Sequence, residues 1–252
     1  MNRKSPMQNP IRRTSARSRV SGQSGLTLIE LMLSLVIGAV VLATTFNIFT
    51  VVKTHADKHF TAVRQQQDMR LGLEVFDQEV RLATAESIEV AAPNQILFHA
   101  NLGAFRTKTT SALLPGQSVI AVQDGSGWSV GKTIVVCSAI VCESHRLARA
   151  GQRNQLTLVE PIESTFSAGA SVEVRNRVVY YAKRDENGAT QFMRMVDGGA
   201  SVMIGRLQAF QFSYWDEMGK RTSAMSRVKR VVLEIVADQP RRTMLRDVSL
   251  QS

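Results

Sequence analysis

The feature that most constrains this chain is a long uncharged stretch near its amino terminus. No Asp, Glu, Lys or Arg occurs from Leu31 to Val52. An α-helix rises about 1.5 Å per residue, so a helix of this length reaches across the roughly 30 Å of hydrocarbon in a bilayer. The sequence therefore predicts one membrane-spanning helix here.

An acidic residue stands directly before this stretch. Glu30 follows Leu26-Thr27-Leu28-Ile29, so its carboxylate lies inside the apolar run. A charged side chain in hydrocarbon costs on the order of 2.5 to 3.5 kcal/mol, so we expect Glu30 to have a partner or a function. No basic residue lies near it, but cleavage between Gly25 and Leu26 would create an α-amino group one helical turn away, in the same subunit or a neighbour.

The residues Gly25-Leu26-Thr27-Leu28-Ile29-Glu30-Leu31 resemble the class III signal of type IV prepilins and of type II secretion pseudopilins. The resemblance implies that a prepilin peptidase cuts after Gly25, that Leu26 is N-methylated and that Glu30 acts in assembly. Leu26 departs from the commonest residue, phenylalanine, but another large apolar side chain suits the same setting. A plain signal anchor and a secretory signal cut after Ala43 are alternatives, and neither explains Glu30.

The same resemblance implies a set of partners and a location. The partners are prepilin peptidase, other major or minor pilins contacted through the N-terminal helix, an inner-membrane assembly platform, and membrane lipid before assembly. The location is the inner membrane, followed by a pilus or pseudopilus filament.

Charge is concentrated in the first 25 residues, although the whole chain carries +10. This leader, 1–25, contains six basic residues and no acidic one: Arg3, Lys4, Arg12, Arg13, Arg17 and Arg19. Basic flanks stay cytoplasmic, so we predict a cytoplasmic amino terminus and a periplasmic head. Translation could begin at Met1 or Met7. Because the high pI is mainly a leader property, it argues little for nucleic acid.

Beyond the membrane segment, 26–52, the pattern becomes amphipathic. Residues 53–90 are expected to continue the helix to about Ala85, with an apolar stripe that faces a core. The stripe consists of Phe60, Val63, Met69, Leu73, Phe76, Val80 and Ala83. Pro93-Asn94 then ends the helical pattern.

Residues 91–252 are expected to form a β-rich head. Four short apolar segments are predicted as strands, at 96–99, 118–122, 133–137 and 156–159, and the stretch 101–116 as a loop. Further strands are expected at 172–175, 177–184, 189–195, 210–214, 228–236 and 243–250, with at least four in an antiparallel meander. Asn187-Gly188 predicts a tight hairpin whose two central residues have positive φ. The fold class is therefore α+β.

This order, a long helix followed by antiparallel strands, resembles pilin-like subunits. Residues 172–250 resemble, more loosely, the W-type minor pilins and the J-type pseudopilins. The larger head and the stretch 131–142 favour the pilus member.

Two cysteines, Cys137 and Cys142, fall in the part expected outside the membrane. An oxidising compartment favours a disulfide between them, worth about 2 kcal/mol on the chain-entropy model. Unpaired buried thiols are one alternative. A metal site with His145 is another, but it lacks a fourth ligand.

Other reactive residues form no catalytic pattern. His55 and His59 are four apart on the expected helix, but no further ligand completes a metal site. We therefore predict no catalytic residue, no metal and no cofactor, and the chain is not expected to be an enzyme.

The basic residues Arg227, Lys229, Arg230, Arg241 and Arg242 could join across a hairpin into a positive strip that binds DNA. A solvated edge that discourages strand aggregation is the simpler interpretation.

These observations predict a minor pilin of a type IV pilus, which primes assembly or lies near the tip. The alternatives are a J-type minor pseudopilin of a type II secretion system, and a DNA-binding or adhesive pilus-tip protein.

Overall fold

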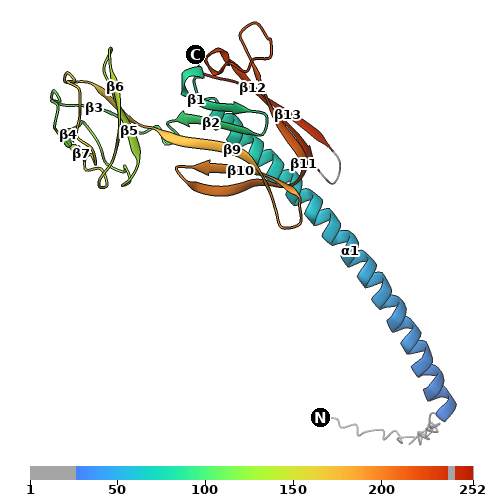
Figure 1. Ribbon diagram of the computed structural model, residues 1–252. Coiled ribbons are helices and arrows are strands. Elements are labelled where there is room, and N and C mark those ends of the chain that lie inside the picture. Colours follow the sequence, from blue (N-terminus) through green and yellow to red (C-terminus); the bar gives the residue numbers. More distant parts are fainter. Residues whose placement is uncertain (1–26, 238–241, 252) are drawn as a thin grey trace, which may run out of the picture. The chain divides into compact units, whose positions relative to one another are not determined.

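The computed structural model describes residues 27–237 and 242–251 (Figure 1). They divide into two units, one that ends at Ala56 and one that begins at Asp57, and each is described by itself. The helical elements are α1 (Leu28–Val80), η1 (Ala85–Ser87) and η2 (Met225–Arg227). The strands are β1 (Ile88–Ala92), β2 (Gln95–Ala100), β3 (Arg106–Lys108), β4 (Val119–Ala121), β5 (Thr133–Cys137), β6 (Cys142–Arg146), β7 (Gln155–Thr157), β8 (Ser171–Val174), β9 (Asn176–Arg184), β10 (Thr190–Val196), β11 (Gly199–Trp215), β12 (Arg230–Ala237) and β13 (Thr243–Ser249).

The first unit contains the uncharged part of α1. Its apolar side chains are exposed, and α1 is long and apolar enough, by length and composition, to cross a membrane. Threonine hydroxyls along α1 in this unit donate to carbonyl groups one turn earlier, which gives each hydroxyl a partner that does not depend on water. They belong to Thr44, Thr45, Thr50 and Thr54.

A seven-stranded antiparallel sheet dominates the second unit, in the order β1-β2-β9-β10-β11-β12-β13. Its long strand β11 changes partners along its length. The residues from Gly199 to Leu207 pair with β10, and those from Leu207 to Trp215 pair with β12. Register shifts occur on both sides of this change, and Arg206 has a positive φ of 54°. Such bulges increase local twist, so the sheet curls around the end of α1.

The main core lies between this sheet and the end of α1. Met69, Leu73, Phe76 and Val80 are buried on the helix, and the Phe76 and Tyr180 rings meet edge to face at 5.1 Å. Buried residues of β2, β9, β10, β11, β12 and β13 join the same cluster. Gly72 permits the close approach, because a Cβ there would lie 2.7 Å from Cγ1 of Ile204.

The helix and its buried stripe are both shorter than the sequence predicted. α1 ends at Val80, and β1 already begins at Ile88, so the expected helical range 53–90 is wrong at its end. A turn at Thr84–Ser87, in which each residue hydrogen-bonds the other, redirects the chain. The stripe is also wrong at its start, since Phe60 and Val63 are exposed; the sheet meets the helix only further along.

Residues 101–175, between β2 and β9, form a second group of strands with its own core. A four-stranded sheet has the order β3-β8-β5-β6, and β4 pairs with β7. The buried cluster of this second group includes Ile134, Phe166 and Trp128 and is separate from the core on α1. The loop expected at 101–116 is wrong in part, because β3 lies within it and pairs with β8. This strand is only three residues long and carries no apolar alternation.

Two hairpin turns differ from the sequence expectation. At Asn187-Gly188 only Gly188 has a positive φ, of 81°, and the Asp185 N–H donates to the Ala189 carbonyl, so the turn is a longer one closed by a left-handed glycine. The tight turn with two positive φ values occurs instead at Asp197-Gly198, with φ of 50° and 92°. The Asp-Gly pair suits this geometry as well as Asn-Gly does, which is why sequence alone did not separate them.

Candidate functional site at the start of α1

The first turn of α1 is closed by a reciprocal pair of hydrogen bonds between Thr27 and Glu30. The backbone N–H of Thr27 donates to Oε2 of Glu30 at 2.9 Å, and the Thr27 hydroxyl donates to the same oxygen at 3.1 Å. In return, the Glu30 N–H donates to the Thr27 hydroxyl oxygen at 3.4 Å. This is a capping box, in which a threonine and a glutamate three residues later satisfy each other's free backbone donors.

The capping box gives the Glu30 carboxylate a local partner. The partial positive charge at a helix amino terminus also favours an anion in the first turn. The sequence predicted a basic partner for Glu30, whereas the partner that the structure shows is an uncharged residue, Thr27. The Thr-x-x-Glu spacing was the signal that could have identified Thr27.

The expected cleavage residues, Gly25 and Leu26, lie outside the described residues. Thr27 is the first described residue and immediately precedes the helix. From Leu31 to Val52 the helix has no charged side chain, so Glu30 is the acid at the edge of an apolar surface.

The two cysteines are joined. Cys137 and Cys142 form a disulfide between the facing ends of β5 and β6, which confirms the expected bond. Between them the turn displays Ile140, whose side chain is almost fully exposed. The bond therefore closes a short hairpin in the inserted group of strands.

The histidines do not assemble a metal site. His145 is buried and its Nε2 lies 3.1 Å from Oε2 of Glu143, while His55 and His59 are exposed on α1. Burial alone would raise the pKa of Glu143, but hydrogen bonds from Ser164, Glu163 and His145 outweigh it and lower the pKa. Within the described ranges no three potential ligands lie together.

The positive strip expected for DNA does not form by hairpin pairing. In the β12–β13 ladder Arg230 pairs with Ser249, whereas Arg242 lies beside Ala237, seven residues further along β12, which is about 23 Å at strand spacing. Arg230 also contacts Asp247 and stacks on the Trp215 ring. Arg241 lies outside the described residues. The expected strip is therefore wrong among the residues that can be placed, because the antiparallel register carries the basic residues to opposite ends.

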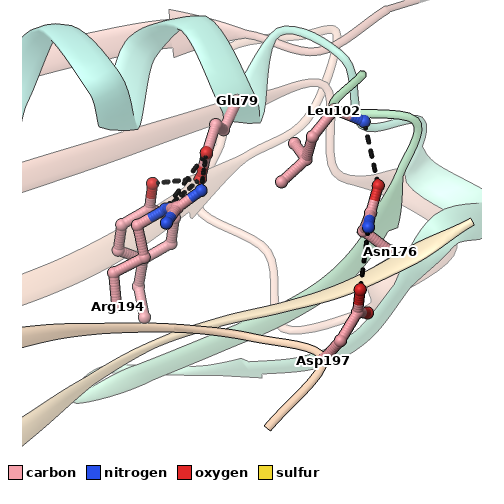
Figure 2. Close-up of polar contacts among 6 residues, drawn as sticks. Glu79, Leu102, Asn176, Arg194 and Asp197 are labelled. Atoms are coloured by element: carbon pink, nitrogen blue, oxygen red, sulfur yellow. Dashed lines mark hydrogen bonds and ion pairs between the residues drawn. The ribbon is translucent and has the colours of Figure 1, made fainter. Parts of the chain in front are cut away.

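A buried ionic contact that the sequence did not predict fixes the end of α1 to the sheet. Both Glu79 oxygens accept from Nε of Arg194 on β10, at 3.0 and 2.9 Å (Figure 2). The Tyr180 hydroxyl of β9 donates to Oε2 of the same carboxylate at 2.6 Å. The hydrogen bond to Glu79 raises the pKa of Arg194, and burial raises that of Tyr180 well above its usual value. No local pattern marks these residues, because they lie on three different elements.

A second contact joins the inserted strands to the main sheet. Asp197, in the tight turn after β10, accepts from Nζ of Lys132 at 2.7 Å and from Nδ2 of Asn176 at 2.8 Å. Asn176 in turn accepts from the N–H of Leu102, as the dashed lines in Figure 2 show. Burial alone would raise the pKa of Asp197, but these hydrogen bonds outweigh it and lower the pKa.

Comparison with known proteins bears on the start of the chain. Residues 20–46 match the family model of the prokaryotic N-terminal methylation motif. No curated protein and no solved structure matches the chain. The matched segment contains Glu30 and the capping box at the start of α1.

Proposed function

From the premise that this chain is a type IV prepilin-like protein, as its N-terminal methylation motif shows, we propose that it is a minor pilin subunit of a type IV pilus. Prepilin peptidase cuts between Gly25 and Leu26, and Leu26 becomes N-methylated. The uncharged part of α1 holds the subunit in the inner membrane, with the head in the periplasm, before the assembly platform moves it into the filament. The single observation that carries the proposal is the motif at the start of an uncharged helix.

The geometry supports a two-stage role for Glu30. In the membrane, Thr27 supplies two donors to one carboxylate oxygen, so the acid is not left without partners in an apolar setting. Thr27 cannot neutralise the charge, however, because its N–H and hydroxyl are uncharged. The α-amino group created by cleavage in an adjacent pilin carries the positive charge that completes the pairing in the filament.

The contact between the end of α1 and the sheet supports a subunit in which the two move together. Glu79 of α1 is held by Arg194 and Tyr180 from two strands, so a displacement of the helix is transmitted to the sheet. We propose no catalytic function and no cofactor, and we place the subunit near the filament tip or in the priming complex.

A J-type minor pseudopilin of a type II secretion system is the second candidate. It would use the same cleavage, methylation and helix packing, and the loose resemblance of residues 172–250 to such proteins favours it. The two machines are separated by deletion of the gene: loss of surface pili with normal secretion supports the first candidate, and the reverse supports the second.

Processing tests the proposal most directly. The Gly25→Val variant should remain at precursor mass in cells with the peptidase, because a β-branched side chain replaces the small residue before the cut. The matched control, Gly38→Val, lies within α1 where a Cβ meets nothing within 4 Å, and it should be processed normally. A wild-type chain that keeps its initiator methionine, or is cut after Ala43, would contradict the proposal.

A further inference from the structure

The last strand, β13, forms an edge of the seven-stranded sheet, and only one of its sides is paired. It pairs with β12 through seven consecutive residue pairs, from Val236 with Thr243 to Arg230 with Ser249, with no register shift. By contrast, the ladders of β10 with β11 and of β11 with β12 both contain irregularities. A long, regular edge strand is a template for another strand unless something protects it.

Two hydrogen bonds establish which backbone groups face the open side. The Ala237 N–H donates to the Arg242 carbonyl, and the Leu250 N–H donates to the Lys229 carbonyl, each at 2.9 Å. Hydrogen-bonded and non-hydrogen-bonded pairs alternate in an antiparallel ladder, and both ends give the same phase. The N–H and C=O groups that point away from β12 therefore belong to Thr243, Leu245, Asp247 and Ser249.

These outward groups have no other partner in the part of the chain that is described, and all four residues are exposed. The usual protections are missing from β13, which has no proline, lysine or bulge. Its one inward charge, Arg246, is neutralised by Asp77 at 3.2 Å and Glu74 at 3.7 Å on α1. The edge is therefore open rather than blocked.

The side chains beside this edge indicate the chemistry of a partner. Leu245 is 68% exposed at the middle of the strand, and Glu234 lies directly opposite it on β12. Glu234 is exposed and forms no ion pair with any described residue. Among the described residues, the cation next to the strand on this face is Arg230, which is paired with Asp247. An apolar centre beside an unneutralised acid complements a strand that carries apolar and basic residues.

We propose that β13 is a docking edge for an extended segment of another protein that carries an apolar and a basic residue two positions apart, so that both side chains lie on the face of the sheet that bears Leu245 and Glu234. The segment adds to the sheet beside β13 and exchanges hydrogen bonds with the outward groups of Leu245 and its neighbours. An apolar side chain covers Leu245, and a basic one reaches Glu234. This mode obtains its affinity from main-chain hydrogen bonds and its selectivity from alternate side chains.

The probe is a short synthetic peptide in which threonine occupies every second position and valine and lysine alternate in the positions between, so that valine and lysine share one face. It is labelled with fluorescein and added to the full chain in detergent micelles. Binding is followed by anisotropy, and amide hydrogen exchange is measured on β13. We expect binding, and exchange at Leu245 and Asp247 slowed about tenfold, because added strands protect outward amides. The same peptide N-methylated on alternate residues should not bind, and a peptide with glutamate in place of lysine should bind more weakly.

Two variants and a matched control complete the test. Leu245→Lys places a protecting charge on the edge and should weaken binding about tenfold, whereas Leu71→Lys, at an equally exposed leucine on α1, should not. Glu234→Gln should reduce the preference for the lysine peptide over the glutamate peptide. Binding that survives N-methylation, or protection that appears away from β13, would overturn the proposal. So would a dimer of the chain without peptide that Leu245→Lys abolishes, because the occupant would then be a second copy.

Discussion

The Tyr180 hydroxyl donates a 2.6 Å hydrogen bond to Oε2 of Glu79, across 101 residues of sequence. Tyr180 lies on β9 and Glu79 in the last turns of α1, and Arg194 of β10 occupies the remaining acceptor positions of the same carboxylate. A helix that must carry a head is thus attached to it by a buried charge with three donors.

Removal of the Tyr180 hydroxyl tests this attachment. Tyr180→Phe should lower the free energy of unfolding by about 1.5 kcal/mol, the usual range for a hydrogen bond to a charged group. Tyr181→Phe is the matched control, since the hydroxyl of Tyr181 makes no hydrogen bond with another described residue and should cost little. Glu79→Ala should cost more, about 3 kcal/mol, because it leaves the Arg194 charge and the hydroxyl without their acceptor. Urea unfolding of the full chain in micelles measures all three, and equal effects of the two tyrosine variants would refute the assignment.

Acid should weaken the contact between α1 and β13. Burial alone would raise the pKa of Asp77, but hydrogen bonds from Arg81 and Arg246 outweigh it, so the folded pKa lies below the ordinary 3.8. A depressed carboxyl pKa stabilises the fold above the unfolded value and stops doing so as pH falls through the folded value.

The free energy of unfolding of wild type should therefore exceed that of Asp77→Asn by about 1 kcal/mol at pH 7. The two free energies should converge below pH 3.8. Asp68→Asn, at an exposed position on the same helix, is the control. Its free energy of unfolding should differ little from that of wild type at any pH, so no convergence should be seen. The measurement is the free energy of unfolding at several pH values, and a pH-independent Asp77→Asn effect would contradict the prediction.

The disulfide should stabilise the inserted strands. Replacement of Cys137 and Cys142 by serine removes the constraint on a short loop, so we expect a loss of about 2 kcal/mol. Reduction of the wild-type bond should reproduce the loss, and the serine variant should not respond to the reductant. A protease should also cut the serine variant and the reduced wild type faster than the oxidised wild type between residues 138 and 141. Unchanged cleavage there would count against a stabilising role.

The turn at Asp197-Gly198 depends on glycine for its backbone conformation. Gly198 has a φ of 92° and an added Cβ would meet nothing, so Gly198→Ala isolates the backbone strain, about 1 kcal/mol. Gly205→Ala is the matched control, with equally open space and no positive φ. Thermal unfolding should separate the two variants, and equal melting temperatures would show that the turn tolerates alanine.

The capping box predicts a role for Thr27 in assembly. Thr27→Ala removes the hydroxyl that donates to Glu30 and should speed amide exchange in the first turn of α1 and reduce incorporation into filaments. Thr45→Ala removes a hydroxyl that bonds only to a carbonyl within the helix, and it should assemble normally. Filament yield is measured against membrane content, so that failed insertion is distinguished from failed assembly. Normal incorporation of both Thr27→Ala and Glu30→Gln would mean that the carboxylate has no part in the process.

Local patterns in the sequence determined the parts of the protein whose cause is local. An uncharged run is long enough to form the first part of α1 whatever follows it, and the spacing of Thr27 and Glu30 closes a helical turn by itself. Cys137 and Cys142 are near enough in the chain to meet across a hairpin whose turn lies between them. Alternating residues likewise predicted most strands after residue 170, because a half-buried strand shows its period directly.

Only the tertiary structure decided which of these elements meet. No periodicity indicates that Glu79 meets Tyr180 and Arg194, that β11 changes partners near Arg206, or that residues 101–175 build a core of their own. The predictions of where the helix ends and of a buried Phe60 were wrong for the same reason. A stripe predicts a face, but which part of the face is covered depends on where the curled sheet lies against it, and that follows from contacts between residues far apart in the chain.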